Sequence, residues 1–376
     1  MRSGGLRILM TTDAVGGVWV FSSSLANALV REGCEVLLVT LGPTPQQEQL
    51  DAVARKGVQV EVTDLALEWM DPEGTDLERT RQTLANIARR FSPDIVHLNS
   101  FRDAVADWQI PVLVTAHSCV RSWWQACRGG EPDDRRWDLY IEQVRSGLAA
   151  ADVWVAPSCA FRDTIEALYS PPNSGVVIRN GINLVASVNV KEPYILAAGR
   201  LWDEAKNVGA LAAVAGNLKW PVRIAGAAET KTNSVAPPRE VDWLGELPHA
   251  DLLKQMQRSA IFVAPALYEP FGLAVLEAAS GGCALVLSDI PTFRELWNDA
   301  ALFVNPNDPA SLRTVVDRIC GDGELRTRFQ HAASRRAQDF PLERTTASYQ
   351  RLYHGLLQAT QPIGLRNRAA RPEVYA

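Results

Sequence analysis

Residues 261–288 read IFVAPALYEPFGLAVLEAASGGCALVLS, and this stretch decides the fold. Its two ends, Ile261 to Ala264 and Ala284 to Leu287, are short apolar runs typical of buried strands. Between them, Pro270 and Gly272 indicate a loop that enters a helix. A strand, a helix and a second strand in this order predict two parallel strands joined by a helical crossover.

The same pattern recurs along the chain. In the first half the apolar runs are Leu6 to Met10, Val36 to Thr40, Val58 to Val62, Ile95 to Leu98, Val112 to Thr115, Val153 to Ala156 and Val176 to Ile178. In the second half they are Tyr194 to Ala198, Val222 to Ala225, Val241 to Leu244 and Leu302 to Val304, besides the two runs quoted above. Helical patterns fill several of the gaps, so we predict an α/β fold of two Rossmann-like halves, each with a mostly parallel sheet covered by helices.

Turn-forming residues separate the two halves. Residues 171–175 and 180–193 are rich in turn formers and show little periodicity, so we place a hinge near residues 180–192. The predicted domains are 1–185 and 186–340, followed by a helix over 341–360. Residues 361–376 contain Pro, Gly and charges without a pattern, which predicts a disordered tail.

Composition narrows the class of protein. The chain has 376 residues, 47% of them apolar and 22% charged, which is typical of a globular protein with two cores. Its net charge of -5, without a long run of Lys or Arg, argues against a nucleic-acid partner. Six scattered cysteines without a Cys-x-x-Cys pair predict reduced thiols in the cytoplasm.

The sequence shows neither of two common membrane signals. The N-terminus lacks the organisation of a signal peptide, and no run approaches the roughly 20 apolar residues of a membrane span. We therefore expect a cytoplasmic protein and leave peripheral contact with the inner face of the membrane open. Residues 121–137 mix Trp with Arg, but interspersed acidic residues largely cancel the charge, so this segment reads as an acceptor platform or as an ordinary folded loop.

Ligands of open α/β sheets bind where strands end and loops lead into helices, so two loops stand out first. Gly16 and Gly17 precede a helix, where the backbone can approach a phosphate, although a tight turn without a ligand explains them equally. Arg200 and Lys206 follow a second-half strand and could clamp a diphosphate, or could be surface cations paired with neighbouring acids. Neither Gly-x-Gly-x-x-Gly nor a Walker A sequence occurs, which argues against NAD, FAD and P-loop chemistry.

The third loop is the most informative. Glu269 lies just before a helix, and Glu277 lies about two turns along it. An acidic residue at a helix start is a common cap, and Glu277 could face solvent. Glu277 nevertheless has apolar neighbours on both sides, where a carboxylate needs a partner, and a ligand rich in hydroxyl groups would serve.

At this point the chain resembles a known family. The segment Tyr268 to Ala278 matches the Glu-x7-Glu signature of the retaining GT-B glycosyltransferases of the family-four, or group 1, type, and the match continues through Gly281-Gly282 to Ser288. With the Gly16-Gly17 and Arg200 to Lys206 loops, the resemblance covers roughly residues 6 to 357. It implies the GT-B architecture, in which two Rossmann-like domains face each other across a cleft, with the acceptor on the side of residues 1–185 and the donor held by residues 186–340.

The resemblance also implies roles for individual residues. Glu277 would bind ribose hydroxyls, Arg200 with Lys206 the diphosphate, and Glu269 the transferred sugar. The expected catalytic set is Glu269, Lys206, Arg200 and His117. The expected donor-binding set is Gly16, Gly17, Arg200, Lys206, Glu269, Phe271, Gly272, Leu273, Glu277, Gly226 and Leu244, where Gly226 and Leu244 stand for backbone contacts to the base. The helix over 341–360 would cross back to the first domain.

The implied chemistry is transfer of a hexose-type sugar from a UDP- or GDP-sugar to an unidentified sugar, lipid-linked or small-molecule acceptor. Retention of anomeric configuration follows from the resemblance, and the leaving phosphate could take the acceptor proton. No Asp-x-Asp occurs, so we expect no metal and no cofactor. Arg179-Asn180-Gly181-Ile182-Asn183 departs from the usual Pro-Asn-Gly-Ile/Val-Asp, which puts the hinge geometry in doubt.

Two other functions stay open. A sugar-nucleotide epimerase of the same two-lobed fold would bind the same donor and release an isomerised nucleotide sugar. A binding protein without activity would only hold the donor. The donor base, the sugar, the acceptor, the linkage and the oligomeric state leave no signal in the sequence.

Overall fold

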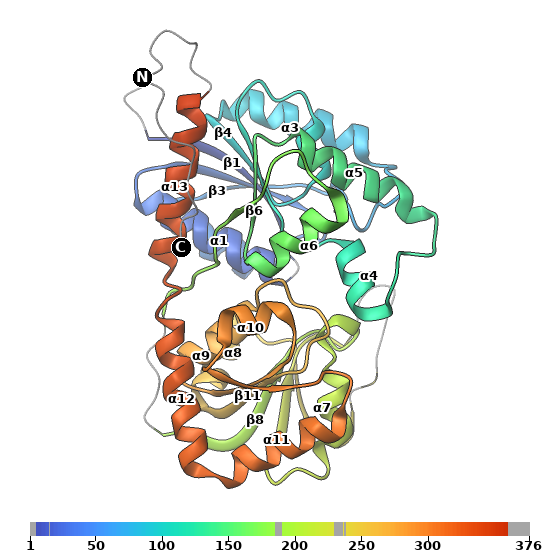
Figure 1. The fold of residues 1–376 in the computed structure, drawn as a ribbon. Coiled ribbons are helices and arrows are strands. Elements are labelled where there is room, and N and C mark those ends of the chain that lie inside the picture. Colours follow the sequence, from blue (N-terminus) through green and yellow to red (C-terminus); the bar gives the residue numbers. More distant parts are fainter. Residues whose placement is uncertain (1–4, 15, 185–189, 229–235, 237, 360–376) are drawn as a thin grey trace. The chain divides into compact units, whose positions relative to one another are not determined.

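The computed structural model describes residues 5–14, 16–184, 190–228, 236 and 238–359 (Figure 1). The expected domain boundary between residues 185 and 186 and the expected tail over 361–376 lie outside the described residues. The chain forms two compact units. Unit 1 comprises Met1–Trp124, Gly130–Asn180 and Leu342–Ala376, and unit 2 comprises Gln125–Gly129 and Gly181–Pro341.

Unit 1 is built on a seven-stranded sheet whose neighbouring strands are all parallel, in the order β3-β2-β1-β4-β5-β6-β7. Its strands are β1 (Arg7–Asp13), β2 (Glu35–Leu41), β3 (Gln59–Val62), β4 (Ile95–Leu98), β5 (Val112–Thr115), β6 (Val153–Ala156) and β7 (Val176–Val177). Its helices are α1 (Gly17–Arg31), α2 (Gln47–Ala54), α3 (Leu77–Phe91), the 3-10 helix η1 (Arg102–Val105), α5 (Arg136–Ala150), α6 (Cys159–Tyr169) and α13 (Leu342–Ala359). The helix α4 (Val120–Arg128) begins in unit 1, and its residues from Gln125 onward are assigned to unit 2.

Unit 2 is built on a six-stranded parallel sheet in the order β10-β9-β8-β11-β12-β13. Its strands are β8 (Glu192–Ala198), β9 (Val222–Ala225), β10 (Asp242–Gly245), β11 (Ser259–Ala264), β12 (Ala284–Ser288) and β13 (Ala301–Val304). Its helices are the 3-10 helix η2 (Glu204–Lys206), α7 (Val208–Ala215), α8 (His249–Arg258), α9 (Leu273–Ser280), α10 (Pro291–Trp297), α11 (Pro309–Gly321) and α12 (Gly323–Ala337).

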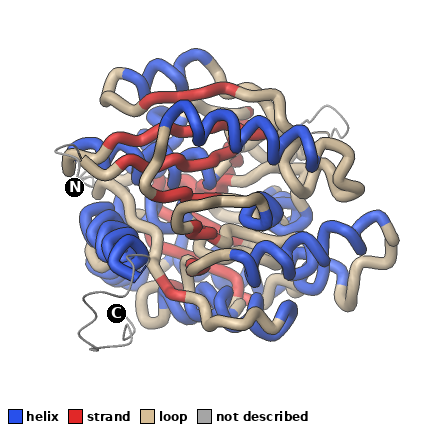
Figure 2. Tube along the Cα trace, turned by 90° about the horizontal axis from the view of Figure 1, so that it is seen from above, coloured by secondary structure: helices blue, strands red, loops and turns tan. Residues whose placement is uncertain are grey.

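Helices cover both faces of the unit 2 sheet, and the strand residues explain why. Successive strand residues point to opposite faces, so a strand that is apolar throughout fills two cores. On β8, Leu196 belongs to the core under α9, whereas Ile195 belongs to the core under α7 and α11. Most strands are followed along the chain by a helix, and Figure 2 shows helices in blue around strands in red. The prediction of two parallel, helix-covered sheets is confirmed.

The last helix, α13, packs within unit 1 although it follows unit 2 in the chain. Buried His97 of β4 joins it by a hydrogen bond of 2.7 Å between Nδ1 and the Tyr353 hydroxyl. The other ring nitrogen, Nε2, lies 2.7 Å from the Thr115 hydroxyl, which also meets the Tyr349 hydroxyl at 3.1 Å. Burial lowers the pKa of His97 to about 3, so the ring is neutral at physiological pH.

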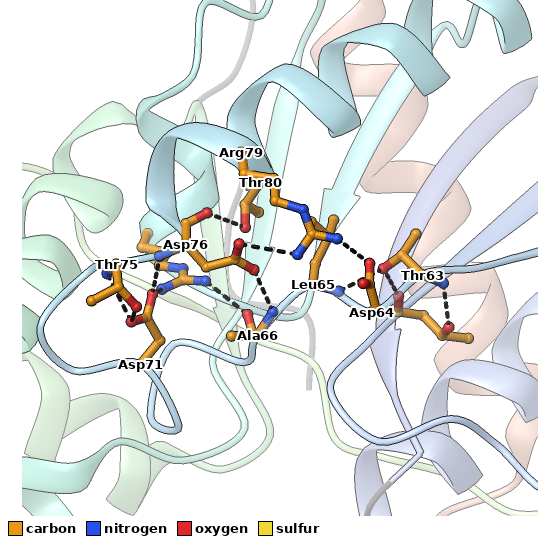
Figure 3. Close-up of polar contacts among 11 residues, drawn as sticks. Thr63, Asp64, Leu65, Ala66, Asp71, Thr75, Asp76, Arg79 and Thr80 are labelled. Carbon is orange, nitrogen blue, oxygen red and sulfur yellow. Dashed lines mark hydrogen bonds and ion pairs between the residues drawn. The ribbon is translucent and has the colours of Figure 1, made fainter.

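The long loop between β3 and α3 is held by buried charges (Figure 3). Arg102 of η1 donates to Asp71 at 3.0 Å and to the Ala66 carbonyl at 2.7 Å, and its side chain is 1% exposed. Asp71 also accepts hydrogen bonds from the backbone and hydroxyl of Thr75. Asp76, the residue before α3, accepts the backbone N–H of Ala66 at 2.8 Å. These contacts give the loop a fixed path across the edge of the sheet.

Candidate functional site

The loops after β8 and β11 lie side by side in unit 2, because these strands are parallel neighbours. The backbone N–H of Leu267 donates to the Ala205 carbonyl at 2.8 Å and so joins the two loops. Asn207, in the left-handed conformation with φ 49°, donates its side-chain amide to the carbonyls of Pro265 at 2.9 Å and Pro306 at 3.0 Å. Both loops therefore have a fixed backbone.

These two loops bring Lys206 and Glu269 together. The Lys206 ammonium donates to Glu269 Oε2 at 2.6 Å, and the two side chains are 28% and 18% exposed. Both line a small hollow of unit 2 together with Ala198 and Gly272. The pair is thus a half-buried charge pair that a ligand can reach, and neither residue is used up in the apolar core.

Local backbone geometry fixes Glu269 in the loop just before α9. Gly272, the residue before this helix, has φ 91°, a conformation that favours glycine. A Cβ atom at Gly272 would lie 3.1 Å from the Phe293 ring and 3.4 Å from Cγ of Glu269. Phe271 is buried, and Leu273 is the first residue of α9. The segment from Glu269 to Leu273 is therefore closely packed, and the first N–H groups of α9 point toward it.

Arg200 is paired with a neighbouring acidic residue, as the interpretation of it as a surface cation predicts. Its guanidinium donates to Asp203 at 2.6 Å and lies over the Trp202 ring, 4.7 Å from the ring centroid. Asp203 also accepts the backbone N–H of Ala205 at 3.1 Å and caps η2. The Arg200 side chain is 34% exposed, so part of it stays accessible to a ligand.

Glu277 is buried and has a protein partner that the sequence did not reveal. His249, the first residue of α8, lies with Nε2 2.6 Å from Glu277 Oε1. The side chain of Glu277 is 6% exposed and that of His249 is 47% exposed. The hydrogen bond to the carboxylate raises the pKa of His249 above its ordinary value. His249 belongs to no motif, so only the packing of α8 on α9 could have identified it.

The two segments expected to contact the nucleotide base, around Gly226 and around Leu244, also meet. The Gly226 N–H donates to the Gly245 carbonyl at 2.8 Å, and the Trp243 indole donates to the Gly226 carbonyl at 3.0 Å. A Cβ atom at Gly226 would lie 2.0 Å from the Gly199 carbonyl oxygen, so only glycine fits at this position. Leu244 is partly buried against the core of unit 2.

His117, Gly16 and Gly17 belong to unit 1. Gly16 has φ 76° and precedes α1, Gly17 is its first residue, and both are exposed. His117 Nε2 lies 2.6 Å from Asn99 Oδ1, and burial lowers the pKa of His117 to about 3. Asn99 donates its amide to the Thr11 carbonyl at 2.6 Å, which orients its oxygen toward His117.

A neutral His117 therefore donates through Nε2 and keeps a lone pair on Nδ1. Asn99 was missed in the sequence because it follows a strand without any motif around it.

Two further observations concern the described part of the chain alone. None of its helices is long and apolar enough to cross a membrane. Among the same residues, no three His, Cys, Asp or Glu side chains gather as the ligands of one metal ion would.

Comparisons with known proteins agree with this geometry. The sequence profile of Glycosyltransferase Family 4 matches residues 15–185, and that of Glycosyl transferases group 1 matches residues 185–336. The glycogen synthase of Mycobacterium tuberculosis is 25% identical over 395 residues, which cover 93% of this chain and 94% of the relative.

Solved structures share the fold. Sucrose-phosphate synthase from Thermosynechococcus elongatus superposes with a TM-score of 0.79 at 18% sequence identity. The match covers 94% of this chain and 100% of the synthase chain. Anabaena HepE, solved in complex with UDP-glucose, has a TM-score of 0.75 at 15% identity over 93% of this chain and 100% of its own. With the two profiles adjoining in the same order as the two units, the chain belongs to the group 1 glycosyltransferases of the GT-B fold.

Proposed function

We propose that this transferase moves a hexose-type sugar from a UDP- or GDP-sugar to a sugar, lipid-linked or small-molecule acceptor. The observation that carries the proposal is the Lys206–Glu269 pair, with Nζ and Oε2 2.6 Å apart beside the start of α9. A cation for a diphosphate and a carboxylate for sugar hydroxyls are the two groups that a nucleotide-sugar donor needs. We further propose retention of anomeric configuration and no catalytic metal.

The difficult step is breaking the bond between the anomeric carbon and the phosphate oxygen, which leaves negative charge on the diphosphate. Lys206 carries three N–H donors and gives one to Glu269, so two are left for phosphate oxygens. Arg200 carries five and gives one to Asp203. Both cations are already oriented by a carboxylate, which reduces the reorganisation needed when the diphosphate departs.

The transferred sugar would be held by Glu269 and by the backbone of Phe271, Gly272 and Leu273. Glu277 would accept hydrogen bonds from the ribose, and the backbone at Gly226 and Leu244 would face the base. In unit 1, the lone pair on Nδ1 of neutral His117 would accept a sugar hydroxyl, and Gly16 and Gly17 would offer backbone N–H groups to the diphosphate. The leaving phosphate would take the acceptor proton, so no protein base is required.

The relatives support these substrate classes. The glycogen synthase relative names a sugar polymer as product, and the HepE structure carries UDP-glucose, which favours a hexose donor and a sugar acceptor. We also propose a cytoplasmic location. None of the six cysteines forms a disulfide, in agreement with a reducing compartment, and liposome flotation tests peripheral contact with the membrane.

The test is product analysis with a panel of UDP- and GDP-sugars, with and without a pool of sugar acceptors. A transferase releases nucleoside diphosphate in an acceptor-dependent manner. An isomerised nucleotide sugar without acceptor would instead identify the alternative function, a sugar-nucleotide epimerase. Binding without either product would identify a protein that only holds the donor.

A further inference from the structure

The carboxylate of Glu277 depends on a single side chain for its position. Glu277 lies within α9, with 6% of its side chain exposed, and among the described residues the side chain of His249 is the one hydrogen-bond partner of its carboxylate. A buried carboxylate without a donor would be costly, so His249 offsets part of the cost of burying this group. The contact uses Oε1 and leaves Oε2 without a bond to any described residue.

The packing of α8 on α9 fixes this contact. Lys191, partly buried next to β8, donates to the Gln257 carbonyl at 2.6 Å and also to the Gly281 carbonyl, and so ties the C-terminal ends of both helices. A Cβ atom at Gly281 would lie 3.2 Å from the Met256 carbonyl carbon, so the two helices approach closely there. His249 at the other end of α8 is thereby held at a set distance from Glu277.

We propose that His249 is a positioning residue for nucleotide binding, which holds Oε1 of Glu277 so that Oε2 accepts the ribose hydroxyls of the donor. This inference rests on the proposed function, because the ribose contact of Glu277 belongs to it. It adds a residue that no motif contains, and it gives donor binding a dependence on pH.

The direction of that dependence follows from the charges around His249. Glu277 of α9 is the acidic group that faces it and raises its pKa. The charged residues next to the opposite end of α8, Glu192 and Lys191, bind Arg258 and helix carbonyls instead. The imidazolium form donates a charge-assisted hydrogen bond to the Glu277 carboxylate and places a positive charge near an anionic nucleotide. Affinity is therefore highest below the pKa of His249 and falls as the pH rises through it.

The test compares two ligands on three proteins by calorimetry. The ligands are the tightest binder among ADP, GDP and UDP, and its 2′,3′-dideoxy analogue. The variants are His249→Ala, which removes the donor, and His249→Gln, whose amide replaces Nε2 without titrating. Lys254→Ala is the matched control, because Lys254 lies on the same helix in an exposed pair with Asp251, 2.8 Å long.

We expect His249→Ala to weaken binding of the ribose nucleotide about tenfold, as loss of a charge-assisted contact does, with kcat for the bound donor little changed. The dideoxy analogue should lose less than about twofold, because it lacks the hydroxyls that Oε2 would accept. His249→Gln should restore most of the affinity and should lack the additional weakening of about threefold that wild type shows between pH 6 and pH 8.5.

Equal losses for both ligands, or a pH profile of His249→Gln identical to that of wild type, would overturn the inference and leave the proposed function standing. Absence of any nucleotide binding by wild-type protein would instead remove the proposed function and the inference together. The pKa of His249, followed by NMR without ligand, gives a further check, since it should drop in Glu277→Gln, and an unchanged value would also refute the proposal.

Discussion

We expect the protein to lose measurable stability in mild acid because of the buried His97. It is 0% exposed, and both ring nitrogens are bonded, to Tyr353 and Thr115 at 2.7 Å each. Because burial lowers its pKa from 6.5 to about 3, the folded state excludes a proton that the unfolded chain accepts. Stability is thus complete above pH 6.5 and is lost as the pH falls below it.

The magnitude follows from the linkage relation. At pH 5 the histidine of the unfolded chain is about 1.5 pH units below its pKa and is protonated, whereas the buried ring of the folded chain is not. At 1.4 kcal/mol per unit, this difference lowers the free energy of unfolding by about 2 kcal/mol between pH 7 and pH 5. His97→Gln removes the titrating ring. We expect the variant to be less stable at pH 7 by about 1–3 kcal/mol, because its amide fits the two hydroxyl partners less well.

The assay is urea denaturation of both proteins at pH 7, 6 and 5, with hydrogen exchange of α13 as a local probe of unit 1. The stability gap between wild type and variant should narrow by about 2 kcal/mol from pH 7 to pH 5. A gap that stays constant with pH, or an NMR titration of His97 near pH 6.5 in the folded protein, would refute this reasoning.

Three substitutions probe the backbone around the site. Gly226→Ala should lower the free energy of unfolding by about 1–3 kcal/mol and weaken nucleotide binding, because the added Cβ would lie 2.0 Å from the Gly199 carbonyl oxygen. An unchanged nucleotide affinity in calorimetry would contradict this prediction. Asn207→Ala removes two hydrogen bonds between loops and should lower the free energy of unfolding, measured by urea denaturation, by about 1–3 kcal/mol. An unchanged free energy of unfolding would show that the loops do not need these hydrogen bonds. Gly355→Ala, in the exposed middle of α13 with free space around it, should instead raise the melting temperature by adding about 1 kcal/mol of stability, and a decrease would show that α13 is strained there.

Much of the fold could be predicted because apolar runs of three to five residues mark buried parallel strands. The boundaries were less readable, as β1 shows. The run Leu6 to Met10 ends where polar residues begin, yet the strand continues to Asp13. Thr11 and Thr12 are buried in it, and the Thr11 hydroxyl accepts the backbone N–H of Asn99 at 2.9 Å. A partner 88 residues away in the chain leaves no local pattern.

The site shows the same division. The Glu-x7-Glu spacing and the loop after β8 make Glu269, Glu277 and Lys206 candidates, but they do not show which of these groups meet. Lys206 pairs with Glu269, 63 residues further on, whereas Arg200 pairs with Asp203 three residues away. His249 was missed because its contact arises only when α8 packs on α9.

The most direct test of sugar transfer by this protein is acceptor-dependent release of nucleoside diphosphate from UDP- and GDP-sugars by wild type, Lys206→Ala and Glu269→Ala. Lys254→Ala serves as the control for loss of an exposed charge pair. We expect release by wild type and by the control, with turnover lowered about 100-fold or more in each of the other two variants, since we propose that Lys206 acts on the departing diphosphate and Glu269 on the sugar. Near-normal turnover in either variant, with its fold intact, would contradict this expectation.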